Sequence, residues 1–129
     1  MKIFAQKLLV GRTFLANQTV TVEDGQITAI GGGGPADFSV WALTPGLVDL
    51  HCHGGQGFDP ELNERPLPEF LTILLCHGVT VVLLTLGAEP LATLRRARAV
   101  LQSAMQQQAA AILPGAHILG VHLEGPFLS

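Results

Sequence analysis

The 129-residue sequence has few charged side chains and no basic run. Charged residues make up 13% of the chain, and the net charge is −3 at pH 7. A typical domain has about 25% charged residues, so the low share here indicates that many faces of the chain contact other protein. The absence of a basic run and the negative net charge argue against nucleic acid as a partner. The three clustered arginines, Arg95, Arg96 and Arg98, are typical of one solvated helix face.

Cysteines and long apolar runs are also scarce. The two cysteines, Cys52 and Cys76, lie in apolar segments and predict small core residues rather than a disulfide scaffold, which favours a reducing cytoplasm. The longest apolar run, residues 79–88, is far shorter than the roughly 18 residues that a membrane span needs. Because Lys7 and Arg12 interrupt the apolar N-terminal stretch, no signal peptide is predicted, and we expect no membrane partner.

The first 44 residues predict β-strands joined by turns. Asp24-Gly25 lies between two β-prone runs, which is a strong hairpin signal. Residues 31–35, rich in glycine, predict a loop. Upstream of the hairpin, Gly11-Arg12 and Asn17 separate three short β-prone runs, at residues 7–10, 13–16 and 18–22.

From residue 45 onward, the pattern predicts parallel strands that alternate with helices, with right-handed crossovers. A continuous β-branched and apolar run at Val79–Leu86 is typical of a buried parallel strand. The other predicted elements are a strand from Leu47 into His51-Cys52-His53, a helix from Pro68 to a cap at Gly78, a helix from Pro90 to before Pro114, and a strand over His117–Glu124.

The stretch around His51 carries the first candidate functional motif of the sequence. Because side chains alternate along a strand, Leu47, Asp49, His51 and His53 are predicted to share one face, where two imidazoles could bind one metal ion. Taken alone, the pair is weak evidence for a metal site, because such histidines also occur at a solvated strand end, each hydrogen-bonded to backbone. The glycine-rich loop that follows, residues 54–59, could approach a ligand closely or be a plain flexible loop.

A second element near the C-terminus has the same construction. His122 and Glu124 are predicted to share one face of the last strand, just before Gly125-Pro126. In parallel α/β proteins, active sites lie at the C-terminal ends of strands, where His51 and His53 also lie. A carboxylate beside histidines completes the usual ligand set of a hydrolytic metal site, so the spacing predicts a candidate metal hydrolase.

These two motifs resemble a known family. Residues 45–54, PGLVDLHCHG, resemble the first barrel strand of the amidohydrolase superfamily, and residues 122–127, HLEGPF, narrow the resemblance to the N-acetylglucosamine-6-phosphate deacetylases. The resemblance implies an α/β fold: residues 45–129 as the first three strands of a partial (β/α)₈ TIM barrel, and residues 1–44 as part of a small β-sandwich domain. A whole barrel needs about 250 residues, so the chain would be the N-terminal part of such an enzyme.

The resemblance also implies an activity, metal-dependent hydrolysis of the acetamide of N-acetylglucosamine 6-phosphate to glucosamine 6-phosphate and acetate. Glu124 would bind the catalytic metal, with His51 and His53 holding a second ion, and zinc is the expected metal, as one ion or two. His122 would order the site or contact substrate. The acid–base aspartate and the phosphate-binding residues would lie after Ser129, and the complete enzyme would be a cytoplasmic homodimer.

Two alternatives stay open. The protein could be another amidohydrolase that acts on cyclic amides, as dihydroorotases and hydantoinases do, because the first motif is shared across the superfamily. The 129 residues could also be an inactive metal-binding or assembly module. The family's Pro-Thr pair at the end of the second barrel strand is Leu84-Thr85 here, so no role is assigned to Thr85 from the resemblance.

Overall fold

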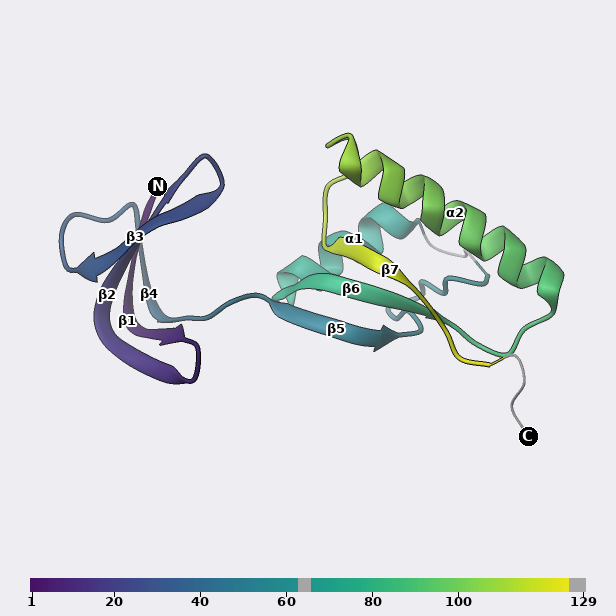
Figure 1. The fold of residues 1–129 in the computed structure, drawn as a ribbon, viewed down its shortest axis with the longest axis horizontal. Helices are drawn as coiled ribbons and strands as arrows, with labels where there is room; N and C mark the ends of the chain where they lie inside the picture. Colours follow the sequence, from purple (N-terminus) through teal and green to yellow (C-terminus); the bar gives the residue numbers. More distant parts are fainter. Residues whose placement is uncertain (63–65, 126–129) are drawn as a thin grey trace. The chain divides into compact units, whose positions relative to one another are not determined.

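The computed structural model describes residues 1–62 and 66–125. The chain divides into two compact units, Met1–Pro45 and Gly46–Ser129, each with one β-sheet (Figure 1). Both helices of the described residues belong to the second unit, and neither is long and apolar enough to cross a membrane. The elements in chain order are β1 (Lys2–Val10), β2 (Thr13–Glu23), β3 (Gln26–Gly32), β4 (Phe38–Leu43), β5 (Leu47–Cys52), α1 (Leu67–Cys76), β6 (Val79–Leu86), α2 (Leu91–Ala109) and β7 (His117–Leu123).

The first unit is a four-stranded sheet with the order β3-β2-β1-β4. Strand β1 pairs antiparallel with β2 and parallel with β4, and β2 pairs antiparallel with β3. Asp24 and Gly25 both have positive φ, at 50° and 76°, as the predicted two-residue hairpin turn requires. The buried core of this sheet is small, consisting of Ala5, Leu8 and Val20.

Two details of the first unit differ from the sequence prediction. Asn17 does not separate two strands: β2 runs through it from Thr13 to Glu23, and Asn17 has a φ of 52° within the strand, which asparagine tolerates better than most residues. Gly31 and Gly32 are not loop, because they pair with Thr19 and Gln18 as the end of β3. In both places the pairing with a neighbouring strand overrides a local turn signal.

The second unit has three parallel strands in the order β5-β6-β7, connected by α1 and α2. Its elements agree closely with the prediction because proline and glycine mark the helix ends. Pro66 and Pro90 occupy the N-cap positions, where a missing N–H costs nothing, and Gly78, with φ at 82°, follows the C-cap of α1. Strand β6 has the predicted bounds, Val79–Leu86.

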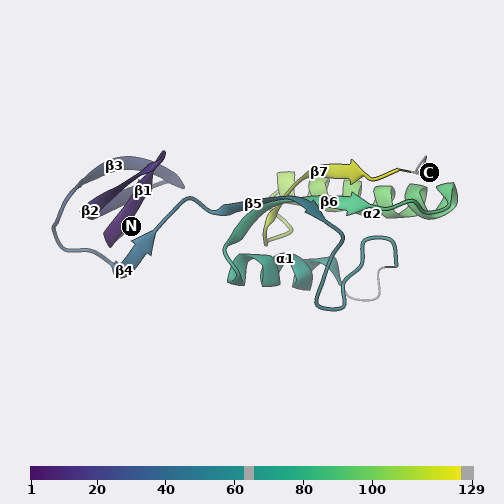
Figure 2. The ribbon, with the colours of Figure 1, turned by 90° about the horizontal axis from the view of Figure 1, so that it is seen from below.

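One face of this sheet packs against the helices. Val82, Leu84 and Leu86 of β6 are completely buried, and they form one cluster with apolar side chains of α1 and α2. Figure 2 shows α1 alongside the strands β5 and β6. Thr85 alternates with these residues and therefore lies on the opposite face. That opposite face carries the polar residues of the site.

The alternation predicted for β5 does not hold along the whole strand. The pairing register shifts between Asp49, which pairs with Val82, and Cys52, which pairs with Leu84. Asp49 thus lies on the helix side of the sheet together with Cys52, and it does not share a face with His51, which the sequence had predicted. The Asp49 Oδ1 atom instead accepts a hydrogen bond from the backbone N–H of His51, at 3.1 Å, across the irregular segment.

The glycine-rich loop after β5 is a tight turn anchored in the core. The backbones of Gly55 and Phe58 exchange two hydrogen bonds, of 2.8 and 2.9 Å, around Gln56 and Gly57, which both have positive φ. The Phe58 ring is buried and stacks on Phe70 of α1, with ring centroids 4.7 Å apart. The loop is thus a turn closed by its own backbone hydrogen bonds and attached to α1 through the Phe58–Phe70 stack.

Candidate metal centre

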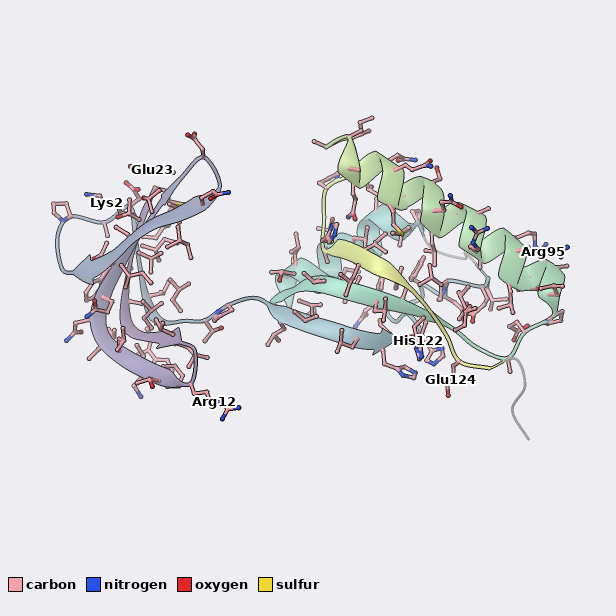
Figure 3. The ribbon with its side chains drawn as sticks, viewed as in Figure 1. Lys2, Arg12, Glu23, Arg95, His122 and Glu124 are labelled. Atoms are coloured by element: carbon pink, nitrogen blue, oxygen red, sulfur yellow. The ribbon has the colours of Figure 1, made fainter. Side chains whose placement is uncertain are left out.

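The predicted site residues gather at the C-terminal edge of the parallel sheet. His51 lies near the end of β5 and His53 just beyond it, while His122 lies in β7 and Glu124 directly after that strand. Figure 3 shows His122 and Glu124 close together at the end of β7. In the second motif, residues 126 and 127 fall outside the described residues, so the structure describes that motif only up to Gly125.

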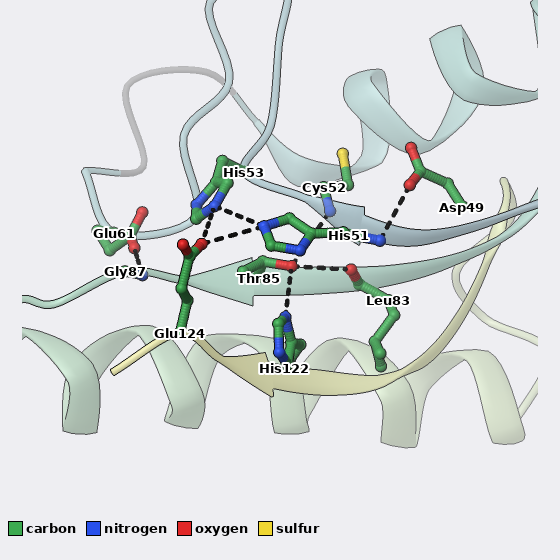
Figure 4. A network of polar contacts seen from close by, with 10 residues as sticks. All are labelled: Asp49, His51, Cys52, His53, Glu61, Leu83, Thr85, Gly87, His122 and Glu124. Atoms are coloured by element: carbon green, nitrogen blue, oxygen red, sulfur yellow. Dashed lines mark hydrogen bonds and ion pairs between the residues drawn. The ribbon is translucent and has the colours of Figure 1, made fainter. Parts of the chain in front are cut away.

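Three of these side chains point at one place (Figure 4). The Nε2 atoms of His51 and His53 are 3.0 Å apart, and Glu124 Oε2 lies 3.0 Å from the first and 2.8 Å from the second. The three atoms thus form a nearly equilateral triangle, although Glu124 is 71 and 73 residues away from the histidines. Among the described residues, this is the group of histidine and carboxylate side chains whose geometry could hold a metal ion.

Hydrogen bonds cannot satisfy all three contacts at once. Each Nε2 atom carries either one hydrogen or one lone pair. If both nitrogens of His51 and His53 donate to Glu124, neither has a lone pair left for the other nitrogen. If one nitrogen is instead an acceptor, its lone pair faces the carboxylate lone pairs, which repel it. A cation bound to all three atoms would satisfy them simultaneously.

The separations also suit a small divalent ion. Nitrogen and oxygen ligands about 2.0–2.1 Å from a tetrahedral ion lie about 3.3 Å from each other, close to the 2.8–3.0 Å seen here. The side chains remain half exposed, at 51% for His51, 47% for His53 and 44% for Glu124. The group therefore fits three ligands of a site whose remaining positions are open to water, substrate or further protein.

The electrostatics keep the carboxylate in its ligand form. The hydrogen bond to His53 lowers the pKa of Glu124 below its usual value, and the contacts with His51 act in the same direction, whereas desolvation opposes them. Metal ligands must be deprotonated to bind. The neighbours of Glu124 thus favour the ionised carboxylate that a metal ion requires.

His122 lies beside the triangle but does not join it. Its Nδ1 atom is 3.2 Å from the hydroxyl of Thr85, and its ring meets that of His51 edge-on, with centroids 5.0 Å apart and planes at 69°. The same hydroxyl accepts a hydrogen bond from the backbone N–H of Cys52, at 3.1 Å. Thr85 thus connects the strands β5, β6 and β7 below the candidate site.

Two of these contacts could not be predicted from sequence patterns. The sequence predicted that Thr85 lies at a strand end, but nothing in it indicated that the Thr85 hydroxyl contacts His122. Glu61 lies in the loop after β5, and its Oε1 atom accepts a 2.6 Å hydrogen bond from the backbone N–H of Gly87, just past β6. That contact ties the loop to the edge of the sheet, and no local signal marks it.

Comparison with known proteins gives the following relationships. No protein-family model matches the chain. The N-acetylglucosamine-6-phosphate deacetylase of Vibrio furnissii is 33% identical, over 97% of this chain and 32% of that protein. The N-acetylgalactosamine-6-phosphate deacetylase of Escherichia coli O157:H7 is 32% identical, over 97% of this chain and 33% of that protein.

A solved structure agrees in fold. A mutant of the N-acetyl-D-glucosamine-6-phosphate deacetylase from Mycobacterium smegmatis, in complex with N-acetyl-D-glucosamine-6-phosphate, superposes with a TM-score of 0.78 at 30% identity, over 100% of this chain and 33% of that one. The chain spans about a third of the length of the curated relatives it matches. Sequence and structure thus agree, over nearly all residues of this chain, with the N-terminal third of proteins named N-acetylglucosamine-6-phosphate deacetylase.

Proposed function

We propose that the complete protein hydrolyses the acetamide of N-acetylglucosamine 6-phosphate. One water molecule is consumed, the amide C–N bond breaks, and acetate and glucosamine 6-phosphate are released. The observation that carries this proposal is the convergence of His51, His53 and Glu124 in a chain that is 33% identical to a deacetylase with this name. The complex of the M. smegmatis relative with N-acetyl-D-glucosamine-6-phosphate supports the same substrate class.

The proposed cofactor is zinc, held by Glu124 together with His51 and His53. Histidine nitrogens and a carboxylate oxygen are typical zinc ligands. A bound divalent ion would supply an activated water and polarise the amide carbonyl. The three ligand atoms surround a single point, which supports one ion at this position. Measured stoichiometry decides between one ion and two.

The wider architecture is part of the proposal. Residues 45–129 would form the first three strands of a (β/α)₈ barrel, and residues 1–44 part of a β-sandwich. The parallel order β5-β6-β7 and the site at the C-terminal edge of the sheet support the barrel. The acid–base aspartate and the phosphate-binding residues are expected beyond Ser129. The homodimer and the cytoplasmic location stay predictions.

A second candidate substrate is N-acetylgalactosamine 6-phosphate. The E. coli O157:H7 relative, named for that substrate, is 32% identical over the same 97% of the chain. The two sugars differ only at the C4 hydroxyl, which lies away from the acetamide. The candidate metal ligands would serve both substrates equally, so the choice between them depends on residues that contact the sugar.

The test assays the full-length gene product for acetate release from both sugar phosphates and, separately, for ring opening of a cyclic amide such as dihydroorotate. We expect turnover of N-acetylglucosamine 6-phosphate to exceed that of the other two and to depend on divalent metal. A preference for the galactosamine epimer would select the second candidate. Turnover of the cyclic amide alone would overturn the proposed function, and so would metal-independent deacetylation.

A further inference from the structure

The hydroxyl of Thr85 lies at the centre of a polar cluster on the site's face of the sheet. The Thr85 side chain is completely buried, so each of its hydrogen bonds must come from the protein. Three polar atoms surround Oγ1: the backbone N of Cys52 at 3.1 Å, Nδ1 of His122 at 3.2 Å and the backbone O of Leu83 at 3.5 Å (Figure 4).

Accounting for the hydrogens assigns a direction to each contact. A hydroxyl has one hydrogen to donate and two lone pairs. The backbone N–H of Cys52 can only donate, so it uses one lone pair of Oγ1. The single hydroxyl hydrogen can then go either to the oxygen of Leu83 or to Nδ1 of His122. At 3.5 Å the Leu83 oxygen is beyond the usual range of an O–H···O bond, whereas 3.2 Å to Nδ1 is acceptable.

We propose that Thr85 is a positioning residue that holds His122 in the tautomer with its hydrogen on Nε2. Because Nδ1 accepts from the Thr85 hydroxyl, the neutral ring must carry its hydrogen on the other nitrogen. Within the described residues, the hydrogen bond of His122 is the one at Nδ1, so the Nε2–H is available as a donor. His122 is then a hydrogen-bond donor beside the candidate metal ligands and does not bind the metal itself.

The opposite tautomer of His122, with its hydrogen on Nδ1, would leave the Thr85 hydroxyl without a good acceptor. If His122 bound a metal through Nε2, Nδ1 would carry the hydrogen and donate it to Thr85. The hydroxyl would then accept twice, and its own hydrogen would be left with the distant oxygen of Leu83. A buried donor without a good acceptor is disfavoured. Thr85 therefore selects against His122 as a metal ligand.

The donor suits an oxygen atom of the substrate. The His122 ring lies edge-on to that of His51, so its free nitrogen belongs to the same edge of the sheet as the ligand triangle. A fixed N–H donor at such a place stabilises negative charge that develops on an oxygen during amide hydrolysis. This step rests on the proposed function, whereas the tautomer assignment does not.

The direct test is histidine tautomer measurement in the full-length protein. With ¹⁵N-labelled histidine, long-range ¹H–¹⁵N NMR spectra separate protonated from unprotonated ring nitrogens, and His122→Gln identifies the signals. We expect His122 to have an unprotonated Nδ1 and a protonated Nε2 in the wild type and in Thr85→Ser, which keeps the hydroxyl. In Thr85→Val, which has the same shape without the hydroxyl, we expect a mixture of tautomers.

Two outcomes would overturn the proposal: a protonated Nδ1 in the wild type, or the wild-type tautomer persisting in Thr85→Val. The wild-type spectrum decides the assignment even if Thr85→Val fails to fold. Metal analysis of His122→Gln gives an independent readout, since we expect wild-type metal content, and a loss equal to that of His51→Ala would contradict the donor role.

Activity provides the last comparison. If the proposed deacetylation is correct, Thr85→Val should lower kcat by at least about tenfold with little change in KM, and Thr85→Ser should restore most of it. A failed deacetylase assay combined with the expected tautomer would refute the proposed function alone. Equal kcat values in Thr85→Val and the wild type would refute the role of the donor in the reaction.

Discussion

The triangle formed by His51 Nε2, His53 Nε2 and Glu124 Oε2 combines two atoms that are close in sequence with one that only the fold brings near. The Nε2 atoms of His51 and His53 come from one strand end, and their 3.0 Å separation follows from positions two residues apart. Glu124 reaches them only because β7 lies in the same sheet as β5, two strands away. Since all three side chains are about half exposed, replacing any of them removes a candidate ligand without opening the core.

The first prediction concerns these ligands. In the full-length protein, His51→Ala and Glu124→Ala should both lower metal content. Glu124→Ala should cost more activity, at least about 100-fold, because it removes the charged ligand assigned to the catalytic metal. Metal analysis and acetate release measure the two effects. His117→Ala, an exposed histidine at the start of β7, is the matched control and should change neither. Unchanged metal content in both ligand variants would refute the assignment.

The second prediction concerns Glu61, whose carboxylate accepts a hydrogen bond from the backbone N–H of Gly87. Burial raises the pKa of Glu61 above its usual value, the hydrogen bond from Gly87 N–H lowers it, and the neighbouring Asp59 raises it again, for a net increase. The folded protein therefore binds this proton more tightly than the unfolded chain does. The resulting stabilisation is fully present below the ordinary carboxyl pKa of about 4.3, and it is lost as pH rises through the higher folded value.

Glu61→Gln keeps the acceptor Oε1 and removes the charge. We expect a small rise of Tm at neutral pH relative to the wild type, and a difference that disappears toward about pH 4, where the wild-type carboxyl is protonated. Melting curves across this pH range measure it. Glu23→Gln, an exposed position at the end of β2, is the control and should run parallel to the wild type. A loss of stability in Glu61→Gln confined to neutral pH would contradict the sign.

At the scale of elements, the turn after β5 fixes where His53 lies. Gly54 has a φ of 102°, and a Cβ atom added there would collide with the backbone carbonyl of Phe58. The carbonyl cannot move easily, because Phe58 is buried against Phe70 and bonded to Gly55. The turn thus couples the core of the second unit to the adjacent candidate metal ligand, His53.

The third prediction is that Gly54→Ala destabilises the full-length protein by about 2 kcal/mol or more and lowers its metal content. The cause is the combination of an unfavourable φ with a backbone collision next to His53. Denaturant unfolding and metal analysis are the measurements. Gly33→Ala meets no atom within 4 Å and should stay within about 0.5 kcal/mol of the wild type. Similar stabilities for the two variants would show that the turn can rearrange.

The bounds of helices and strands could be predicted from the sequence only where a local signal marks them. The bounds of β6, the starts of both helices and the end of α1 follow from a continuous β-branched run and from prolines and a glycine at the ends, which are local signals. The end of α2 at Ala109 comes before the stop predicted at Pro114, because no local signal marks it. The break predicted at Asn17 was wrong because pairing between β1 and β2 continues across it. The face predicted for Asp49 was wrong because the register shift in β5 depends on its neighbour β6.

The residues of the candidate site could be predicted from the sequence, but the contacts around them could not. The residue types and the strand ends of His51, His53 and Glu124 were visible in the motifs, and the parallel topology was enough to bring them to one edge. The partners of Thr85 and Glu61 were not predictable, because both contacts join segments whose separation in space is decided by the whole sheet.

For the whole molecule, much apolar surface is left open. Side chains on both outer strands of the parallel sheet are more than half exposed: Leu47 (58%), Val48 (55%), Leu50 (60%), Leu119 (52%) and Leu123 (55%). In the first unit, Trp41 is 65% exposed on a sheet whose buried core has three residues. Such surfaces are normally covered by further protein, as the low charge content of the sequence also indicates.

The fourth prediction follows from this surface: the 129 residues produced alone neither fold stably as a monomer nor release acetate from the deacetylase substrate. The outer strands β5 and β7 present unpaired backbone groups that favour aggregation. We expect the acid–base group and the phosphate site beyond Ser129, and three candidate ligands without them cannot complete the reaction. Gel filtration, thermal melting and an acetate assay with added zinc test this, with the full-length protein as the positive control. A cooperative melt from a monomer, or acetate release above that of zinc alone, would show that these residues are self-sufficient.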